Sequence, residues 1–106
     1  MPQANALTKR QVAREFKRLV AEYRRETGDL ASQYHMAAHP AYQAIIAMGR
    51  PVVPLLLKQL RQNPDSWFLA LSMITKANPE RPADFPDTRQ RAEAWLRWGR
   101  QHGYIR

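Results

Sequence analysis

The chain has 106 residues, the size of one domain, and 44% of them are hydrophobic, which excludes a largely disordered protein. It contains no cysteine, and this excludes disulfides, thiolate metal sites and cysteine nucleophiles. The 17 lysine and arginine residues outnumber the 9 acidic residues and give a net charge of +8, so we expect an anionic partner: nucleic acid, an acidic protein or a membrane surface.

The first expected element is a basic amphipathic helix over residues 8–27, preceded by a frayed segment 1–7. Thr8 and Gln11 have the spacing of a capping box, and Gly28 suits the left-handed position after the helix. The apolar residues that repeat at helical spacing are Val12, Phe16, Leu19, Val20 and Tyr23. The cations that gather on the opposite face, within about a third of the circumference, are Arg10, Arg14, Lys17, Arg18, Arg24 and Arg25.

A second, shorter helix is expected over residues 30–39, starting from Asp29 or Ser32. Pro40 suits the first position of the next helix, because no amide hydrogen bond is lost there. Gly49 is expected to end that helix, so the break between two apolar runs falls at this glycine.

The following helix is expected over residues 52–60. Its two prolines are tolerated if Pro51 is the cap and Pro54 is the third helical residue, since the first turn has no intrahelical amide partners. Asn63 and Pro64 are expected to close it.

The next helix, residues 67–77, is apolar nearly all round, which is typical of a helix buried from more than one side. We therefore expect it at the centre of the fold, capped by Asp65 or Ser66. The three prolines of residues 78–86 exclude a helix there, and Phe85 is expected to pin this loop to the core.

The last helix is expected over residues 87–101, capped by Asp87 with Gln90. Trp98 lies at the border of its apolar face, a position typical of an interface anchor. Gly103 is expected to stop the helix and to let an apolar tail pack on the body. Alternation of period two is nowhere sustained, so the sequence predicts a single all-α domain, a compact bundle of five to six short helices.

The middle of the chain resembles a HEAT-type repeat. The run AIIAMGRPVVPLLLKQL followed by NPDSWFLALSMI is similar to that family's pattern: a helix ending in a Gly turn, a helix opening on Val-Pro with leucines three to four apart, and an Ala-Leu-rich helix. The resemblance covers residues 41–76 and implies a HEAT-like helical hairpin within a core over 40–77. A solenoid needs about three units, so segments 8–27 and 87–106 are expected to cap the one or two units present.

The wider string, HPAYQ with WFLAL and WLRWGRQHGY, is similar to a group of small bacterial proteins that have no assigned function. This resemblance implies a bacterial cytosolic origin and an accessory or antitoxin-like role, and it carries no catalytic residue to transfer. The N-terminus lacks an apolar core of signal-peptide length, and no run approaches the roughly 18 apolar residues of a membrane span. We therefore expect a cytoplasmic protein.

No set of residues has the composition of a catalytic or metal site. His35 and His39 are four apart, as metal-binding pairs are, but the further ligands of a tetrahedral site are missing apart from Asp29 and distant carboxylates. Ser66 and Ser72 are better explained as a helix cap and a polar gap than as nucleophiles with a base. We expect neither an enzyme nor a cofactor.

The basic face of residues 8–27 is the most informative polar feature. Arg14 has a like-charged neighbour four residues away on both sides, which is unfavourable in an isolated helix. Glu22 can pair with Arg18 and Arg25, and the other cations have no obvious local partner. This excess of one sign favours an anionic partner, with a solvated basic stripe as the alternative.

Two functions follow from these patterns. The first is a non-enzymatic interaction module that binds a protein partner through the central helices and the basic helix. The alternative is a nucleic-acid-binding regulator whose basic face lies on phosphates. Membrane binding is disfavoured, because the apolar face of the basic helix is needed for the core. The oligomeric state stays open.

Overall fold

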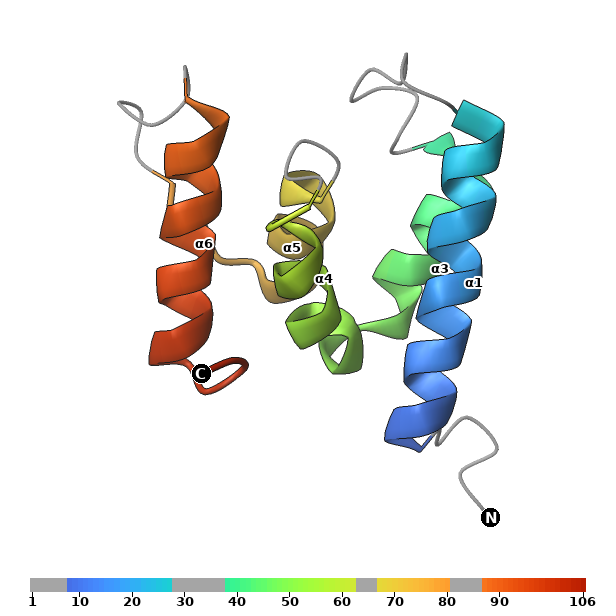
Figure 1. The fold of residues 1–106 in the computed structure, drawn as a ribbon, viewed down its shortest axis with the longest axis horizontal. Helices are drawn as coiled ribbons and strands as arrows, with labels where there is room; N and C mark the ends of the chain where they lie inside the picture. The colour runs from blue at the N-terminus through green and yellow to red at the C-terminus, as the bar shows by residue number, and fades with distance from the viewer. Residues whose placement is uncertain (1–7, 28–37, 63–66, 81–86) are drawn as a thin grey trace.

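The computed structural model of the chain describes residues 8–27, 38–62, 67–80 and 87–106 (Figure 1). All the regular structure in these residues is helical, which confirms the all-α prediction. The elements are α1 (Lys9–Thr27), α3 (Pro40–Met48), the 3₁₀ turn η1 (Arg50–Val52), α4 (Val53–Gln59), α5 (Phe68–Thr75) and α6 (Thr88–Gln101). The expectations that lie outside the described residues are those for the segment 1–7, Gly28, the helix at 30–39 with Asp29, Ser32 and His35, the break at Asn63 and Pro64, the caps Asp65 and Ser66, and Phe85.

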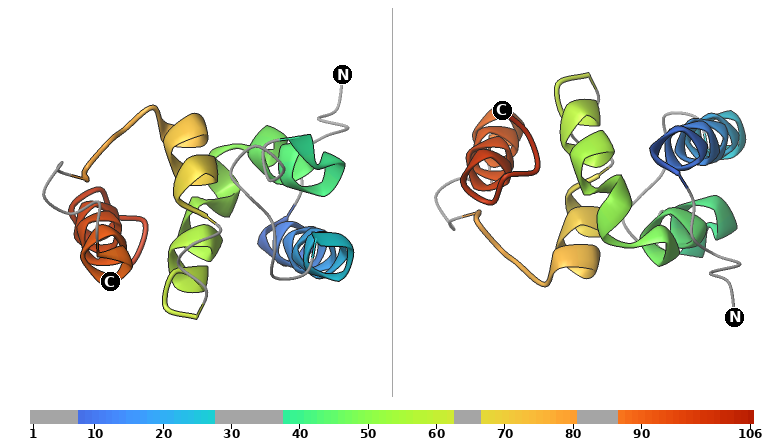
Figure 2. Two further views of the ribbon diagram at one scale, coloured as in Figure 1. Left: turned by 90° about the horizontal axis from the view of Figure 1, so that it is seen from above. Right: turned by 90° about the horizontal axis from the view of Figure 1, so that it is seen from below.

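The helices form a row with α1 and α3 at one end, α4 and α5 in the middle and α6 at the other end (Figures 1 and 2). α1 and α3 lie side by side and run in opposite directions. The molecule measures 47 × 33 × 21 Å along its principal axes, so the row is flattened. As a result, α1 and α6 each keep an outward face.

Side-chain caps predicted from local spacing begin two of these helices. At α1 the amide of Thr8 donates to Gln11 Oε1 (2.8 Å) and the amide of Gln11 donates to Thr8 Oγ1 (3.1 Å), which completes the capping box. At α6 the Oδ1 of Asp87 accepts from the amides of Arg89 (2.9 Å) and Gln90 (3.3 Å). Both N-termini therefore satisfy orphan amides with their own residues.

α3 begins at Pro40 and is followed by Gly49, as the sequence predicts. The Nδ1 of His39 accepts from the amide of Ala41 (3.0 Å), and Pro40 is the first helical residue. Gly49 follows the last residue with φ +76°, a conformation that L side chains rarely adopt. The chain then bends by 100° between α3 and the segment Arg50–Gln59.

The start of α4 differs from the prediction. Pro51 lies in η1, Val52 is the N-cap, and Pro54 is the second helical residue and not the third. The amide of Val52 donates to the carbonyl of Gly49 (3.1 Å), and this i→i+3 bond closes the 3₁₀ turn in front of the helix. The tight turn accounts for the shift of one position.

Trp67, the residue before α5, makes no side-chain cap hydrogen bond to this helix. Tyr42 of α3 takes this role: its hydroxyl accepts from the amide of Ala70 (3.0 Å) in the first turn of α5. At the other end Lys76 adopts a left-handed conformation with φ +61°. The hydroxyl of Thr75 donates to the carbonyl of Leu71 (2.7 Å) and accepts from the amide of Ala77 (3.1 Å), so this buried side chain closes the helix.

α5 packs on α3 and α4, and Phe68 and Leu71 are buried in these contacts. Its other side is partly open, because Leu69 and Ile74 are half-buried and Met73 is 42% exposed. The expectation of a helix buried from more than one side is therefore met only in part.

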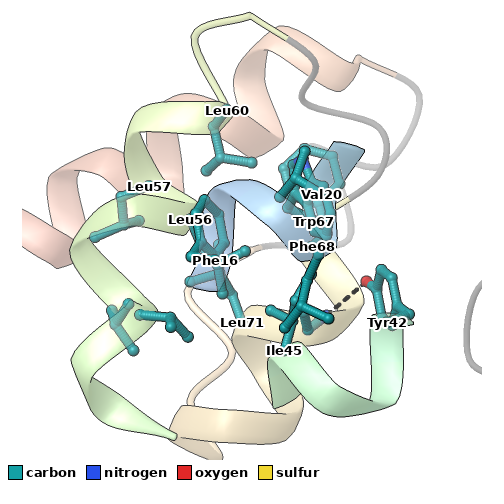
Figure 3. Close-up of a cluster of buried hydrophobic side chains, with 14 of the residues drawn as sticks. Phe16, Val20, Tyr42, Ile45, Leu56, Leu57, Leu60, Trp67, Phe68 and Leu71 are labelled. Carbon is teal, nitrogen blue, oxygen red and sulfur yellow. Dashed lines mark hydrogen bonds between the residues drawn. The ribbon is translucent and has the colours of Figure 1, made fainter. Parts of the chain in front are cut away.

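Aromatic side chains occupy the middle of the core (Figure 3). Tyr42 and Trp67 stack with ring centroids 5.4 Å apart and an angle of 3° between the rings. Phe16 and Tyr23 of α1 lie 6.4 Å and 5.7 Å from Trp67. Two helices, α1 and α3, and the residue that precedes α5 thus share one aromatic cluster, in which each ring adds contact area and a preferred geometry.

Glu80, in the segment between α5 and α6, binds two side chains of α6. Its side chain is only 7% exposed and accepts from Arg91 Nε (2.6 Å) and Trp95 Nε1 (2.7 Å). The guanidinium of Arg91 also lies over the ring of Phe68, 4.3 Å from its centroid. The Glu80 carboxylate thus joins α6 to the segment after α5, and Arg91 contacts α5 itself through Phe68.

No single described helix has both the length and the apolarity to cross a membrane; α3 and Arg50–Gln59 meet those requirements only as a pair bent by 100°.

Candidate functional site

The outward face of α1 carries the six predicted cations. The opposite face packs into the core through Val12, Phe16 and Tyr23, and this orientation leaves the cations exposed. The helix itself lies at one end of the row (Figure 1). The exposed set is Arg10, Arg14, Lys17, Arg18, Arg24 and Arg25.

Two of these cations bind neighbours within the chain. Arg18 forms an ion pair with Glu15 at 2.6 Å and a longer one with Glu22 at 3.7 Å. The hydrogen bond from Arg18 lowers the pKa of the Glu15 carboxyl, and the same bond raises the pKa of Arg18. Arg24 donates to Gln59 Oε1 of α4 at 2.9 Å. The expected pair of Glu22 and Arg18 is thus formed, with Glu15 as the closer partner.

Four cations, which we call the α1 strip, have no side-chain acceptor among the described residues: Arg10, Arg14, Lys17 and Arg25. At 1.5 Å of rise per residue the strip extends about 22 Å along the helix. Glu15, Glu22 and Glu26 follow one flank of the helix. Glu26 contacts His39 Nε2 at 2.8 Å, so this acidic flank is partly occupied by neighbours in the same chain. The α1 strip is therefore long, narrow and bordered by negative charge.

Trp98, the predicted interface anchor, is half-buried among rings of its own chain. His102 stacks on it at 4.4 Å and Tyr104 at 5.4 Å between centroids, and Trp95 meets it edge-on at 5.5 Å. The prediction of an anchor stays a prediction, and the ring has a packing role in the tail.

The tail after α6 turns back sharply at Gly103, as the sequence predicts. Gly103 has φ +77°, its amide donates to the carbonyl of Arg100 (3.2 Å), and the amide of Tyr104 donates to the carbonyl of Gly99 (2.9 Å). These two bonds form a Schellman motif. The turn places the Tyr104 hydroxyl 2.6 Å from Nη1 of Arg50, which donates to it.

A groove of about 500 Å³ lies where the tail, the start of α1 and the start of α4 meet. We call it the tail groove. Its apolar wall consists of Val12, Pro51, Pro54 and Leu55, and its polar groups come from Lys9, Arg50 and Tyr104. Sequence reasoning missed this site, because its residues come from three distant segments and no local pattern marks them.

The residues considered for metal binding or catalysis have structural roles where they are described. His39 caps α3, and the hydroxyl of Ser72 donates to the carbonyl of Leu69 (3.0 Å). Within the described ranges, no group of three or more His, Asp or Glu side chains is placed to hold a metal ion.

Comparisons with protein-family models, with curated proteins and with solved structures found no match to this chain. The HEAT-type resemblance of residues 41–76 and the resemblance to small bacterial proteins stay predictions.

Proposed function

We propose that this chain is a non-enzymatic interaction module that binds an acidic protein partner through the α1 strip. The supporting observation is the group of four exposed cations that lack a side-chain acceptor in the described structure. Arg10 and Arg14 are like-charged neighbours four residues apart, an arrangement that is unfavourable in the isolated chain. Carboxylates of a partner would offset this repulsion.

The acidic flank favours a protein over a continuous polyanion. Glu15 and Glu22 lie on one flank of the same helix, where both pair with Arg18, and a phosphate backbone that covered this face would approach them closely. A folded partner avoids this repulsion by presenting carboxylates to the strip and neutral or basic residues to the flank. An accessory or antitoxin-like role in a bacterial cell, which the sequence resemblance implies, agrees with this type of binding.

A pull-down with a matched control tests the proposal. The test variant carries Arg10→Glu, Arg14→Glu and Arg25→Glu in α1. The control variant carries Arg89→Glu, Arg97→Glu and Arg100→Glu, which make the same charge change on exposed positions of α6. We expect a stoichiometric protein partner from the native cell extract with the unmodified chain and the control variant, and its loss with the test variant. Retention by the test variant, or equal loss with both variants, would contradict the proposal.

Nucleic acid is the second candidate, because the net charge of +8 and a row of cations along one helix are typical of phosphate-binding proteins. If all four strip cations met phosphates, the logarithm of the affinity for random duplex DNA would fall against the logarithm of salt concentration with a slope of about −3.6. Absence of binding near physiological salt would eliminate this candidate. Loss of a steep slope with the α1 variant, and not with the α6 variant, would support it.

A further inference from the structure

We propose that the tail groove binds a small organic carboxylate with a compact apolar body. This site is separate from the α1 strip, since none of the four strip cations lines it. The proposal therefore does not depend on the partner of α1. It rests on the size of the groove, the chemistry of its wall and the charge at its edge.

The groove has the size and composition of a small-molecule site. Its volume of about 500 Å³ lies within the range of about 300–1,000 Å³ that is typical of such sites. Pro51 and Pro54 have no amide hydrogen and Leu55 adds only carbon, so this wall presents few hydrogen-bonding groups. Val12 adds a further apolar side chain to the lining. A compact apolar body would replace water there without leaving polar groups unpaired.

The polar edge is cationic and donates hydrogen bonds. Arg50 uses Nη1 to donate to the Tyr104 hydroxyl at 2.6 Å, and the guanidinium carries four further N–H groups. Because the hydroxyl oxygen accepts this bond, its own hydrogen is directed elsewhere as a donor. Arg50 has no carboxylate partner among the described residues. An arginine beside a hydroxyl donor matches the planar, two-oxygen geometry of a carboxylate.

Lys9 supplies a second cation from the start of α1. The N-terminal end of the helix dipole is positive and adds to the charge of Lys9. The first turn of this helix contains no acidic residue that would offset this potential. Among the described residues, no acidic side chain lines the groove. This charge selects an anion over a neutral or cationic ligand of the same shape.

The tail holds Tyr104 in place before any ligand arrives. The Schellman turn at Gly103 fixes its backbone, and its ring stacks on Trp98 with centroids 5.4 Å apart. A preformed donor site lowers the conformational entropy that binding would otherwise cost.

The test uses naphthalene-2-carboxylate as the probe, with the neutral naphthalene-2-carboxamide as its matched analogue. Both are titrated into the ¹⁵N-labelled full chain and followed by amide shifts. We expect shifts that centre on Leu55 and Tyr104, and about tenfold tighter binding of the carboxylate, the ratio that corresponds to 1.4 kcal/mol. Equal affinity for the two compounds, or shifts that centre on the outward face of α1, would overturn the proposal.

Substitutions in the groove provide the second arm. Arg50→Gln should weaken carboxylate binding about tenfold and leave carboxamide binding unchanged. Tyr104→Phe keeps the stacked ring, removes the hydroxyl donor and should weaken carboxylate binding severalfold. Lys58→Gln removes an exposed cation of α4 that does not line the groove and is the control. A carboxylate affinity within twofold of the unmodified chain in Arg50→Gln would refute the assignment of the anion to this edge.

Discussion

Replacement of Tyr42 by Phe tests how α3 and α5 are joined. The substitution keeps the ring that stacks on Trp67 and deletes only the hydroxyl, which is the acceptor for the amide of Ala70. Tyr42 is 0% exposed, so water does not replace that acceptor without a rearrangement of the core. The variant therefore removes the hydrogen bond that joins α3 to α5.

The expected loss of stability follows from the buried donor. Leaving a buried amide unsatisfied costs about 1–3 kcal/mol. Trp67 offers no side-chain cap that could take over at the start of α5. Because the packing of the ring is kept, we expect Tyr42→Phe to lower the free energy of unfolding by about 2 kcal/mol at pH 7.

The same hydroxyl predicts a dependence on alkaline pH. Burial raises the pKa of Tyr42 well above its usual range, while the hydrogen bond from Ala70 acts in the opposite direction. The folded state holds this proton more tightly than the unfolded state. The protonated hydroxyl therefore contributes its full share of the free energy of unfolding below about pH 10, and this contribution is lost as the pH rises further. The loss approaches about 1.4 kcal/mol for each pH unit above 10. Tyr42→Phe has no such proton, so its free energy of unfolding should fall less steeply with rising pH than that of the unmodified chain.

Urea unfolding followed by tryptophan fluorescence at pH 7 and pH 11 measures both effects. Tyr104→Phe is the control, because its hydroxyl lies in a half-buried site and bonds to the exposed Arg50. A loss below about 0.5 kcal/mol at pH 7, the scale of an ordinary surface substitution, would refute the capping role of Tyr42. Equal alkaline slopes in Tyr42→Phe and the unmodified chain would refute the assignment of the pH effect.

Three further substitutions test the ends and the packing of helices. Lys76→Gly removes a left-handed side chain at φ +61° and should stabilise the fold by up to about 1 kcal/mol in urea unfolding, since the strain of about 1–2 kcal/mol exceeds the added entropy of glycine in the unfolded chain; a lower midpoint would contradict this. Thr75→Val keeps the shape but leaves the amide of Ala77 without its acceptor, and we expect a loss of about 1–2 kcal/mol, with no change in midpoint as the opposing result. Gly99→Ala would place a Cβ 2.5 Å from Leu57 Cδ1. We expect this variant to be less stable, because an overpacking cost of about 1–3 kcal/mol should outweigh a gain in helix propensity of about 1 kcal/mol. A rise in the thermal midpoint would contradict this and show that Leu57 moves aside easily.

Most helix ends in this fold were predictable because their signals are local. Thr8 and Gln11, Asp87, and the sequence around Gly49 each contain donor, acceptor and backbone preference within a few residues. The hydrogen bond from α5 to Tyr42 was not predictable, because Tyr42 lies 28 residues before the amide of Ala70. The proline positions at α4 were misplaced by one, since a 3₁₀ turn precedes the helix and shifts its start.

The candidate sites also differ in whether their residues are close together in the sequence. The basic face could be derived from the rotation of 100° per residue within α1 alone. The contact of Arg24 with Gln59 was not derivable, because the two residues are 35 positions apart. The tail groove depends on how α1, α4 and the tail meet, and the partners across such a junction leave no pattern in any one segment.

The order of the row has a dynamic consequence. α6 meets the body chiefly through α4 and the Glu80 bridge, whereas the stacked rings of Tyr42 and Trp67 lie among α1, α3 and α5. A fluctuation that breaks the bridge can therefore release α6 as a unit while the aromatic cluster stays packed, as cooperative local unfolding requires. The amides of α6 should exchange with solvent through this partial opening, and those of α1 and α3 only when the whole domain unfolds.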